Sequence, residues 1–291
     1  MKTHGKIFRI VAAIALLISA AVLVALPACG GTDFNCTFGQ TQGGNDNGTP
    51  GGVTKPEEDL SDVPEKPETE INKIIDFSTS GNLPVNGWET ANWENDPGLF
   101  GCKWSYNNVW VDEDGKLRLE IRDPKTSGDT ANYNEYRTGG EIRTTAKYGY
   151  GYYSVSMKPM KADGVISSFF TYTGDPRWDE IDIEFLGDDT TKVQFNYYTN
   201  GKGGHEFVYH LGYDASEDFH TYGFEWLEDC IIWYVDGKPV HKATVEIPAY
   251  EQQIMMNLWN IAETGPDDWA GVYKGDLGTA YYEWVGFDAA A

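Results

Sequence analysis

Basic residues and histidines are scarce in this chain. Lys and Arg together number 22 against 45 Asp and Glu, which gives a net charge of −23. A field of this sign repels nucleic acid and other polyanions, so these are excluded as partners and a neutral or cationic partner is expected. The five histidines are scattered, and no cysteine or histidine group has zinc spacing.

Cysteines are also few, since the sequence has only Cys29, Cys36, Cys102 and Cys230. If Cys29 carries a lipid, the three that remain allow at most one intrachain disulfide. The sequence does not decide which two of the three would pair.

A sustained helical period is missing as well. After residue 71, β-branched and aromatic residues recur in short runs separated by Gly, Asn and Asp, a pattern typical of strands and turns. The predicted strands are 148–158, 165–172, 180–186, 192–198, 221–226, 231–235, 239–244, 254–259 and 281–287. Asp236-Gly237 is a two-residue hairpin signal. The pattern predicts an all-β fold, an antiparallel β-sandwich of two sheets that curve to leave a groove on one face.

The first 28 residues have a basic start followed by an apolar run, which predicts a signal peptide at 1–28. Leu26-Pro27-Ala28-Cys29 resembles a bacterial lipoprotein cleavage box, so Cys29 is the predicted lipidation site. Ordinary cleavage and an uncleaved anchor are the alternatives. In each case the protein is exported, as a cell-surface lipoprotein or otherwise secreted, and meets the membrane only through the N-terminal lipid or signal anchor.

Two further segments follow the signal. Residues 29–70 contain almost no large apolar side chain, which predicts a disordered tether. Residues 71–291 are about 220 residues, a size that suits one large β-domain. We expect this domain to be a monomer.

Aromatic residues are abundant, at 14% of the chain with ten Trp and eighteen Tyr. This is more than a core of this size needs. Because the C–H groups of sugars stack well on aromatic rings, the excess favours a carbohydrate ligand.

Three carboxylates alternate with apolar residues in the segment 180–185. This alternation predicts a strand with one apolar face and with Glu180, Asp182 and Glu184 crowded on the other. Glycoside hydrolysis needs an acid and a second carboxylate that attacks or activates water, and two glutamates supply both. Asp182 between them should raise the proton affinity of a neighbour, so that the three titrate together.

A cation site and a solvated acidic strand are the alternative interpretations of these acids. The aromatic neighbourhood argues against the solvated one, and its members are Phe169, Phe170, Tyr172 and Trp178. The i, i+4 spacing of the glutamates does not by itself decide between retention and inversion of the anomeric centre.

The segment 178–187 resembles the active-site strand of glycoside hydrolase family 16. Further segments are similar to the lichenases of this family, which act on mixed-linkage β-1,3-1,4-glucan; they are 167–174, 190–201, 203–206, 219–222, 233–237 and 254–259. The resemblance is dense from about 148 to 269. It implies that residues 71–291 are a glycoside hydrolase catalytic domain, a concanavalin-like jelly roll with a substrate cleft on its concave face. The implied enzyme is a retaining endo-β-glucanase that cuts β-1,4 bonds and requires no cofactor.

The same resemblance implies residue roles. Glu180 would be the nucleophile, Glu184 the acid/base and Asp182 the residue that modulates the pair. The residues implied to bind the glucan are Trp178, Tyr172, Phe170, Asn196, Tyr198, Asn257, Trp259 and Trp269, with Glu141 and Arg143 as a cleft pair. Core packing is the alternative role for each aromatic residue, and a surface salt bridge is the alternative for the Glu/Arg pair.

Three features depart from the family pattern. The common disulfide would join Cys102 to a position that is Gly139 here. The structural calcium of lichenases would use the carboxylate of Glu283, where Glu replaces the usual Asp, and backbone carbonyls near Asp76 and Gly115. The longer Glu side chain leaves the calcium open. The segment 259–269 is about two residues longer than the familiar loop.

Two rival functions stay open at this stage. One is a sibling specificity for xyloglucan, laminarin or galactan. The other is a glycan-binding lipoprotein without catalysis, since lectins also use β-sandwiches with aromatic platforms. An intact pair of glutamates favours the enzyme, because binding alone does not require it.

Overall fold

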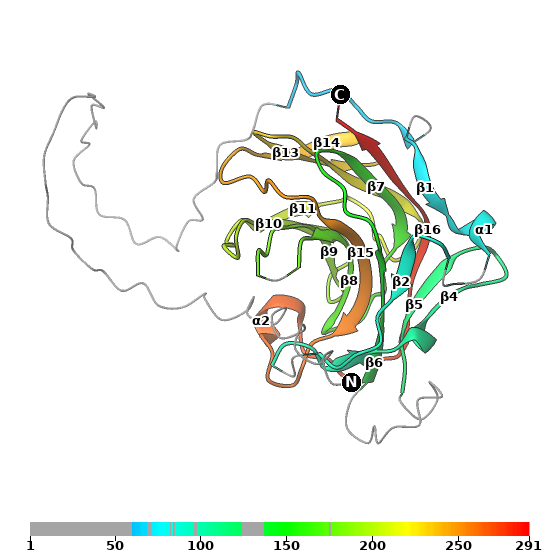
Figure 1. The fold of residues 1–291 in the computed structure, drawn as a ribbon. Helices are drawn as coiled ribbons and strands as arrows, with labels where there is room; N and C mark the ends of the chain where they lie inside the picture. The colour runs from blue at the N-terminus through cyan, green and yellow to red at the C-terminus, as the bar shows by residue number, and fades with distance from the viewer. Residues whose placement is uncertain are drawn as a thin grey trace, which may run out of the picture.

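Antiparallel strands dominate the computed structural model, which describes residues 60–68, 71–81, 83, 85–95, 98–123, 137–174 and 176–290. They form two stacked sheets (Figure 1). Sheet A contains, in spatial order, β14 (Lys238–Ala243), β13 (Ile231–Val235), β12 (His220–Trp226), β7 (Gly151–Lys158), β16 (Gly278–Ala289), β5 (Leu117–Ile121) and β4 (Val109–Val111), and β1 (Lys73–Asp76) pairs with β16.

Sheet B packs against sheet A. It contains, in spatial order, β11 (Phe207–His210), β10 (Lys192–Tyr198), β9 (Glu180–Leu186), β8 (Val165–Tyr172), β15 (Gln253–Asn260), β6 (Arg137–Thr144) and β2 (Trp88–Thr90). The short strand β3 (Cys102–Trp104) pairs with β6 in parallel. Many neighbours in the sheets are far apart in the chain, as β7 is from β12 and β15 from β6, which is the topology of a jelly roll. The predicted fold class is confirmed.

Helices are short in the described part of the chain. The α-helices α1 (Phe77–Ser80) and α2 (Asp267–Ala270) have four residues each. A 3₁₀ turn, η2, spans Tyr106–Asn108. None of the helices in the described residues has the length and apolar character needed to cross a bilayer.

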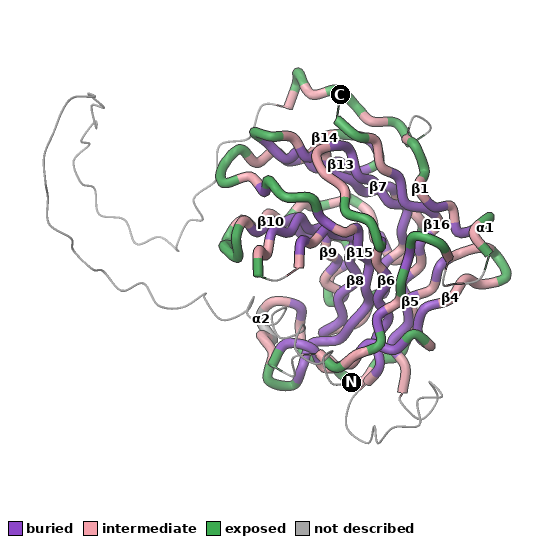
Figure 2. Tube along the Cα trace, in the orientation of Figure 1, coloured by how far each residue is buried: buried purple, intermediate pink, exposed green. Residues whose placement is uncertain are grey.

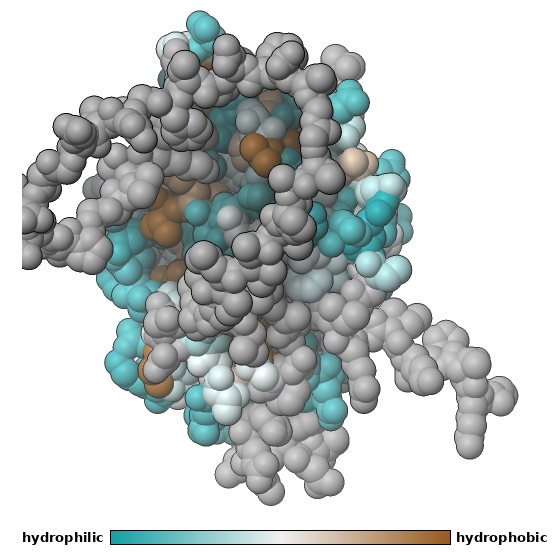
Figure 3. Space-filling view, turned by 90° about the vertical axis from the view of Figure 1, so that its left-hand side faces the viewer, coloured by the Kyte–Doolittle hydropathy of each residue, from teal (hydrophilic) through white to brown (hydrophobic). Residues whose placement is uncertain are grey.

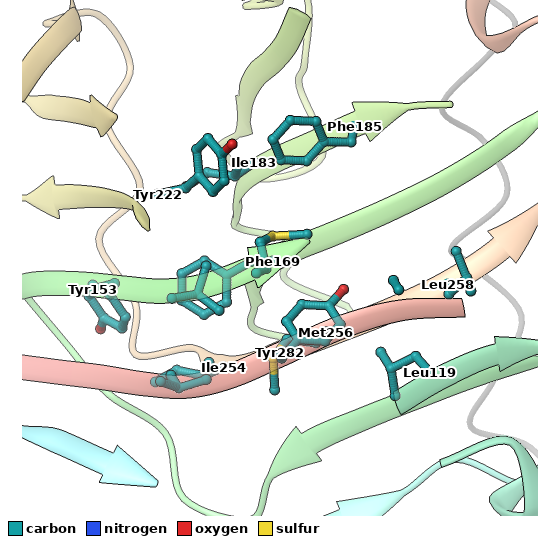
Figure 4. Close-up of a cluster of buried hydrophobic side chains, with 14 of the residues drawn as sticks. Leu119, Tyr153, Phe169, Ile183, Phe185, Tyr222, Ile254, Met256, Leu258 and Tyr282 are labelled. Atoms are coloured by element: carbon teal, nitrogen blue, oxygen red, sulfur yellow. The ribbon is translucent and has the colours of Figure 1, made fainter. Parts of the chain in front are cut away.

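The core lies between the inward faces of the two sheets. Figure 4 shows Leu119, Tyr153, Tyr222 and Tyr282 of sheet A together with sheet B residues in this layer. The labelled residues of sheet B are Phe169, Ile183, Phe185, Ile254, Met256 and Leu258. The central strands of both sheets are buried along most of their length (Figure 2). This layer is what the period-two alternation of the sequence requires.

Most strand predictions are confirmed. The bounds of β8, β9, β10 and β13 are the predicted ones, and the other five predicted strands shift by three residues or fewer at an end. Asp236 and Gly237 both have positive φ, 48° and 75°, as the predicted two-residue hairpin requires. The sequence missed β11 and the strands up to β6, because several of these are only three or four residues long and carry no clear alternation.

Sheet B is curved. In Figure 1, β15 bends with its concave side toward α2 and its convex side toward sheet A. The concave side therefore faces away from the core, and we call it the concave face. Figure 3 views the molecule from the side on which β10 and α2 lie in Figure 1, and hydrophobic areas lie there among hydrophilic surface.

One part of the tether prediction is wrong. Residues 60–68 lie against the domain, where the Lys66 N–H donates to the Gly237 carbonyl at 2.8 Å and Lys66 Nζ pairs with Glu225 at 2.8 Å. Val63 also packs beside buried residues of sheet A. These contacts compensate for ordering a segment that has few apolar residues. The predicted signal peptide, Cys29, Cys36 and the rest of the tether up to residue 59 lie outside the described residues.

Candidate active site

Strand β9 places its three acids on the concave face. Its apolar residues, on the opposite side, are fully buried in the core, and these are Ile181, Ile183 and Phe185. Glu180 and Asp182 are only 7% and 4% exposed, whereas Glu184 is exposed to an intermediate degree. The acids are thus withdrawn from bulk water without being sealed beneath the strand.

Neighbouring strands extend this polar surface. Glu184 is in register with Gln194 on β10 and with Ser168 on β8. Because side chains in register share a face, the concave face also carries Asn196, Tyr198, Phe170, Tyr172, Asn257, Glu141 and Arg143. Phe169 is the exception among the aromatic residues expected around the acids. It lies in the core, because alternation along β8 turns it to the opposite side.

Trp178 contacts the first of the three acids. Its indole Nε1 donates to Glu180 Oε2 at 2.8 Å, and its ring stacks on Tyr198 with centroids 5.4 Å apart. Trp178 has φ of 49°, a left-handed conformation that costs about 1–3 kcal/mol for such a residue. The surrounding structure must therefore hold Trp178 in place.

Asp179 supplies that support. It is 1% exposed, and its carboxylate accepts hydrogen bonds from the backbone N–H of Asn200 at 2.7 Å and of Ala249 at 3.3 Å. The backbone N–H of Asp179 donates to Thr173 Oγ1 at 2.9 Å. Asp179 thus ties three loops together directly beside Trp178. The sequence analysis did not single it out, because its partners are 6 to 70 residues away in the chain.

Burial dominates the electrostatics of the acids. It raises the pKa of both Glu180 and Glu184 above the ordinary value for a glutamate. Donors act in the opposite direction, since the hydrogen bonds from Trp178 to Glu180 and from Gln194 to Glu184 each lower the pKa of the acceptor. The group therefore retains protons near neutral pH, which a reaction that begins with proton donation requires.

Asp182 lies between the two glutamates and is affected by both of their charges. Burial, and then the charges of Glu180 and Glu184, raise its pKa well above the ordinary value. A hydrogen bond between Asp182 and Glu180 raises the pKa of Asp182 and lowers that of Glu180. The charges and this hydrogen bond link the three groups, so the acids titrate as a coupled set.

Gln194 is a site residue that the sequence analysis missed. Its Nε2 donates to Glu184 Oε2 at 3.0 Å, and its side chain is largely buried. A signal was present, because alternation along the predicted strand 192–198 places residues 194, 196 and 198 on one face. Only the pairing of β10 with β9 shows that this face adjoins the acids.

Glu141 and Arg143, which were predicted to form a pair in the cleft, have different hydrogen-bonding partners in the structure. Arg143 Nε pairs with Glu89 Oε1 at 2.7 Å, while Glu141 is 5% exposed and accepts from Asn257 Nδ2 at 3.4 Å. Burial raises the pKa of Glu141 to about 7 despite the nearby Arg143 charge. Both side chains lie on the concave face, but Arg143 forms its ion pair with β2.

Trp259 and Trp269 lie at one end of the concave face, with ring centroids 6.1 Å apart. Trp259 is 4% exposed, and its ring centroid lies 4.4 Å from that of Phe100. It belongs to a second apolar cluster outside the main core, whose members include Ile166. Packing is thus a clear part of the role of Trp259, whereas Trp269 on α2 is less buried.

Comparison with known proteins identifies the family. A model of "Glycosyl hydrolases family 16" matches residues 95–286. The chain belongs to this family. The family predicted from the sequence is confirmed, and the protein is a glycoside hydrolase.

Several proteins named beta-glucanase are closely similar to this chain. A beta-glucanase of Paenibacillus macerans is 54% identical over 202 residues, which is 68% of this chain and 81% of that protein. The solved structure of Bacillus licheniformis beta-glucanase is 46% identical with a TM-score of 0.66, covering 73% of this chain and all (100%) of that one. The solved structure of a prokaryotic beta-1,3-1,4-glucanase (lichenase) from a mouse hindgut metagenome is 48% identical with a TM-score of 0.64. The match covers 70% of this chain and 93% of that one.

The calcium site that the family-16 resemblance implied does not fit the side chains present. Glu283 Oε1 forms an ion pair with Lys116 Nζ, and Glu283 Oε2 accepts from Ser156 Oγ at 2.7 Å. The backbone carbonyl of Asp76 accepts from Thr79 Oγ1 at 3.1 Å, and Gly115 lies against the Ser78 backbone. Calcium prefers six to eight oxygen ligands, and here an ammonium already neutralises the central carboxylate.

In the described residues, no group of three or more His, Cys, Asp or Glu side chains is placed to hold a metal ion. Calcium binding therefore stays a prediction that this donor set does not favour.

Gly139 lies beside the thiol of Cys102. A Cβ built on Gly139 would lie 2.7 Å from Cys102 Sγ and also 2.7 Å from the Leu258 carbonyl oxygen. Cys102 and Cys230 are both buried and both free within the described part of the chain. Burial raises the pKa of the Cys102 thiol to about 12, which makes this cysteine unreactive.

Proposed function

We propose that this family-16 enzyme is a retaining endo-β-glucanase that hydrolyses β-1,4 bonds in mixed-linkage β-1,3-1,4-glucan. The observation that carries the proposal is the arrangement on β9, where Glu180 and Glu184 share the concave face and each accepts a hydrogen bond from a neutral N–H donor. The similarity to proteins named beta-glucanase and to a solved lichenase supports the substrate.

The reaction proceeds in two displacements. In the first, the Glu180 carboxylate attacks the anomeric carbon while Glu184 donates its proton to the glycosidic oxygen, so the C–O bond breaks and a glycosyl ester forms on Glu180. In the second, Glu184 takes a proton from water, and the water oxygen displaces Glu180 from the anomeric carbon. Both glutamates then return to their starting states.

Asp182 modulates this pair. Because it holds a proton toward Glu180, it stabilises the ionised nucleophile without adding a third negative charge. When Glu180 forms its ester and loses its charge, Asp182 can ionise more easily. This coupling keeps the net negative charge on Glu180 and Asp182 nearly constant during the reaction.

The glucan lies along the concave face in this proposal. Trp178 and Tyr198 form a stacked aromatic wall beside Glu180, and Asn196 contacts Tyr198 through a hydrogen bond of 3.3 Å. The remaining residues that we propose to contact sugar are Phe170, Tyr172, Glu141, Arg143, Asn257, Trp259 and Trp269. Their shared face is what supports the assignment.

Export and anchoring are a second part of the proposal. The signal-type segment 1–28 and the lipoprotein-type Cys29 favour an enzyme that is tethered to the cell surface by a lipid. Expression of the full chain in a bacterium that is fed a labelled fatty-acid analogue tests this. Label in the wild type that is absent from Cys29→Ser supports a lipid anchor, whereas unlabelled secreted wild type overturns it.

Substrate profiling tests the proposed activity. Reducing ends are measured after incubation with barley β-glucan, laminarin, xyloglucan and carboxymethylcellulose, and the first-formed anomer is followed by NMR. We expect barley β-glucan to be cut with retention of the β-configuration. Cleavage of laminarin alone, or an initial α-anomer, would overturn the proposal.

A nucleophile variant separates catalysis from binding. Glu180→Gln should lower kcat by about 10⁴-fold or more while glucan still retards the protein on an affinity gel. Turnover close to that of the wild type would remove Glu180 from the nucleophile role.

A further inference from the structure

Gln194 stands between Glu184 and a tryptophan from a distant loop. On one side its Nε2 donates to Glu184 Oε2 at 3.0 Å. On the other side, Trp269 Nε1 donates to Gln194 Oε1 at 3.3 Å. Trp269 and Gln194 are 75 residues apart in the sequence, so the contact depends on the tertiary structure.

The chemistry of the two partners fixes the orientation of this amide. An indole N–H can only donate, so the atom of Gln194 that faces Trp269 must be the oxygen. The NH₂ group must then face Glu184. Without Trp269, the amide could turn by 180° and direct its oxygen at the carboxyl group of Glu184. With Trp269 in place, the orientation with the donor on Glu184 is the more stable one.

We infer that Trp269 is a positioning residue that acts through Gln194 to keep an N–H donor on Glu184, the acid/base of the proposed reaction. The inference rests on the proposed function for the role of Glu184. It goes beyond that function because it gives Trp269 a task other than contact with sugar, and because it assigns a role to Gln194.

The loop that carries Trp269 is held firmly against sheet B. The Gly164 N–H donates to the Ala270 carbonyl at 2.7 Å, and Ala270 is fully buried. The Trp269 ring lies beside that of Trp259, with centroids 6.1 Å apart. Docking of α2 therefore sets the position of the indole N–H, and through Gln194 it sets the environment of Glu184.

Several other groups also face Glu184. Glu180 and Asp182 lie on its own strand and interact with its charge, and Glu206, beyond β10, raises its pKa. Ser168 is in register on β8 but its hydroxyl is donated to Asn257. Among the causes resolved for Glu184, Gln194 is the one that lowers its pKa. Removal of this donor should thus raise the pKa of the acid/base.

A higher pKa of Glu184 changes the pH dependence of activity. Glu184 must be protonated for the first displacement, so activity is lost as pH rises through its pKa. A higher pKa of Glu184 moves this basic limb of the kcat/KM profile to higher pH. Loss of one neutral hydrogen bond corresponds to a shift of about half to one pH unit.

The experiment is a double-mutant cycle with Trp269→Phe, Gln194→Ala and the combination of the two. Phe keeps an aromatic ring at 269 and removes only the donor. We expect each single variant to move the basic limb to higher pH, and the double variant to move it no further than Gln194→Ala does. Trp110→Phe on β4 of sheet A is the matched control and should leave the limb in place.

Two results would overturn the inference. In one, Trp269→Phe raises KM for the glucan while the basic limb stays where it is, which would make Trp269 a sugar contact only. In the other, the shifts of the two single variants add in the double variant, which would mean that Trp269 acts independently of Gln194.

A measurement without turnover separates this inference from the proposed function. The Glu184 carboxyl carbon is titrated by ¹³C NMR and assigned by its loss in Glu184→Gln. If the wild type cuts no β-glucan but the titration of Glu184 shifts upward in Trp269→Phe, the proposed function fails and the positioning contact stands. If the wild type cuts the glucan and the titration does not move, the reverse holds.

Discussion

The indole Nε1 of Trp178 donates a hydrogen bond to Oε2 of Glu180 at 2.8 Å, from a backbone with φ of 49°. The left-handed backbone at Trp178 and the hydrogen bond are related, because this backbone conformation places the indole N–H of Trp178 against the carboxylate of Glu180. The contact stabilises the ionised form of Glu180 against the cost of burial. Removal of the donor should thus have a measurable effect on the pH dependence of the enzyme.

Trp178→Phe should raise the pKa of Glu180, because the carboxylate loses a charge-assisted hydrogen bond. Glu180 must be ionised to attack, so the acid limb of the kcat/KM profile should move to higher pH, by about one unit. Activity on barley β-glucan measured across the pH range checks this. The same substitution at Trp110, on sheet A, should leave the limb unchanged, and an unmoved acid limb in Trp178→Phe would contradict the prediction.

Asp179→Asn should destabilise the fold near Trp178. The carboxylate accepts from two backbone N–H groups, whereas an amide offers one oxygen and directs its NH₂ at the other donor. We expect the free energy of unfolding to fall by about 1–3 kcal/mol in chemical denaturation, with a loss of kcat as Trp178 loosens. Asp276→Asn, at an exposed position, is the control. Equal stability of the two variants would refute the anchoring role.

Gly139→Cys should form a disulfide with Cys102 on oxidation, because the new Cβ would lie 2.7 Å from the existing Sγ. Closing this loop should stabilise the protein by up to about 4 kcal/mol. The gain is reduced because the same Cβ would lie 2.7 Å from the Leu258 carbonyl oxygen. The expected readout is a melting temperature that falls when reductant is added. Gly139→Ser has the crowding without the bridge and should melt below the wild type, and two free thiols in oxidised Gly139→Cys would show that no bridge forms.

Calcium should have little effect on stability. Lys116 already neutralises Glu283, so the melting temperature of the wild type should be the same in excess EDTA and in excess calcium. In Lys116→Met the carboxylate loses its ammonium partner, and we expect a loss of about 1 kcal/mol, since both side chains are partly exposed. A marked drop in the melting temperature of the wild type with EDTA would show that calcium binds in spite of the lysine.

Local pattern was enough to predict much of the site. The alternation of Glu180, Asp182 and Glu184 with apolar residues fixed which side chains enter the core and which share the opposite face. Likewise, two residues that favour positive φ marked the hairpin at 236–237. Each of these two signals is contained within a few consecutive residues, where backbone geometry alone relates sequence to structure.

The early part of the domain was harder to predict. The strands β2, β3 and β4 have only three residues each, and β3 pairs in parallel with β6 across 35 residues. Strands this short have no room for a period, so their pairing is decided by long-range packing. The contact of residues 60–68 with sheet A was missed for the same reason, because its partner Glu225 is 159 residues away from Lys66.

The sequence by itself determined the longer strands from β7 onward, apart from β11, and the acidic face, since each follows from the order of neighbouring residues. Only the tertiary structure decided what surrounds the acids. It brought Gln194 opposite Glu184, Trp269 onto Gln194, and the loops bearing Asn200 and Ala249 onto Asp179. These contacts join residues that the jelly-roll crossovers bring together, and the side chains that tune the proposed acid/base come from strands and loops whose proximity has no local signature.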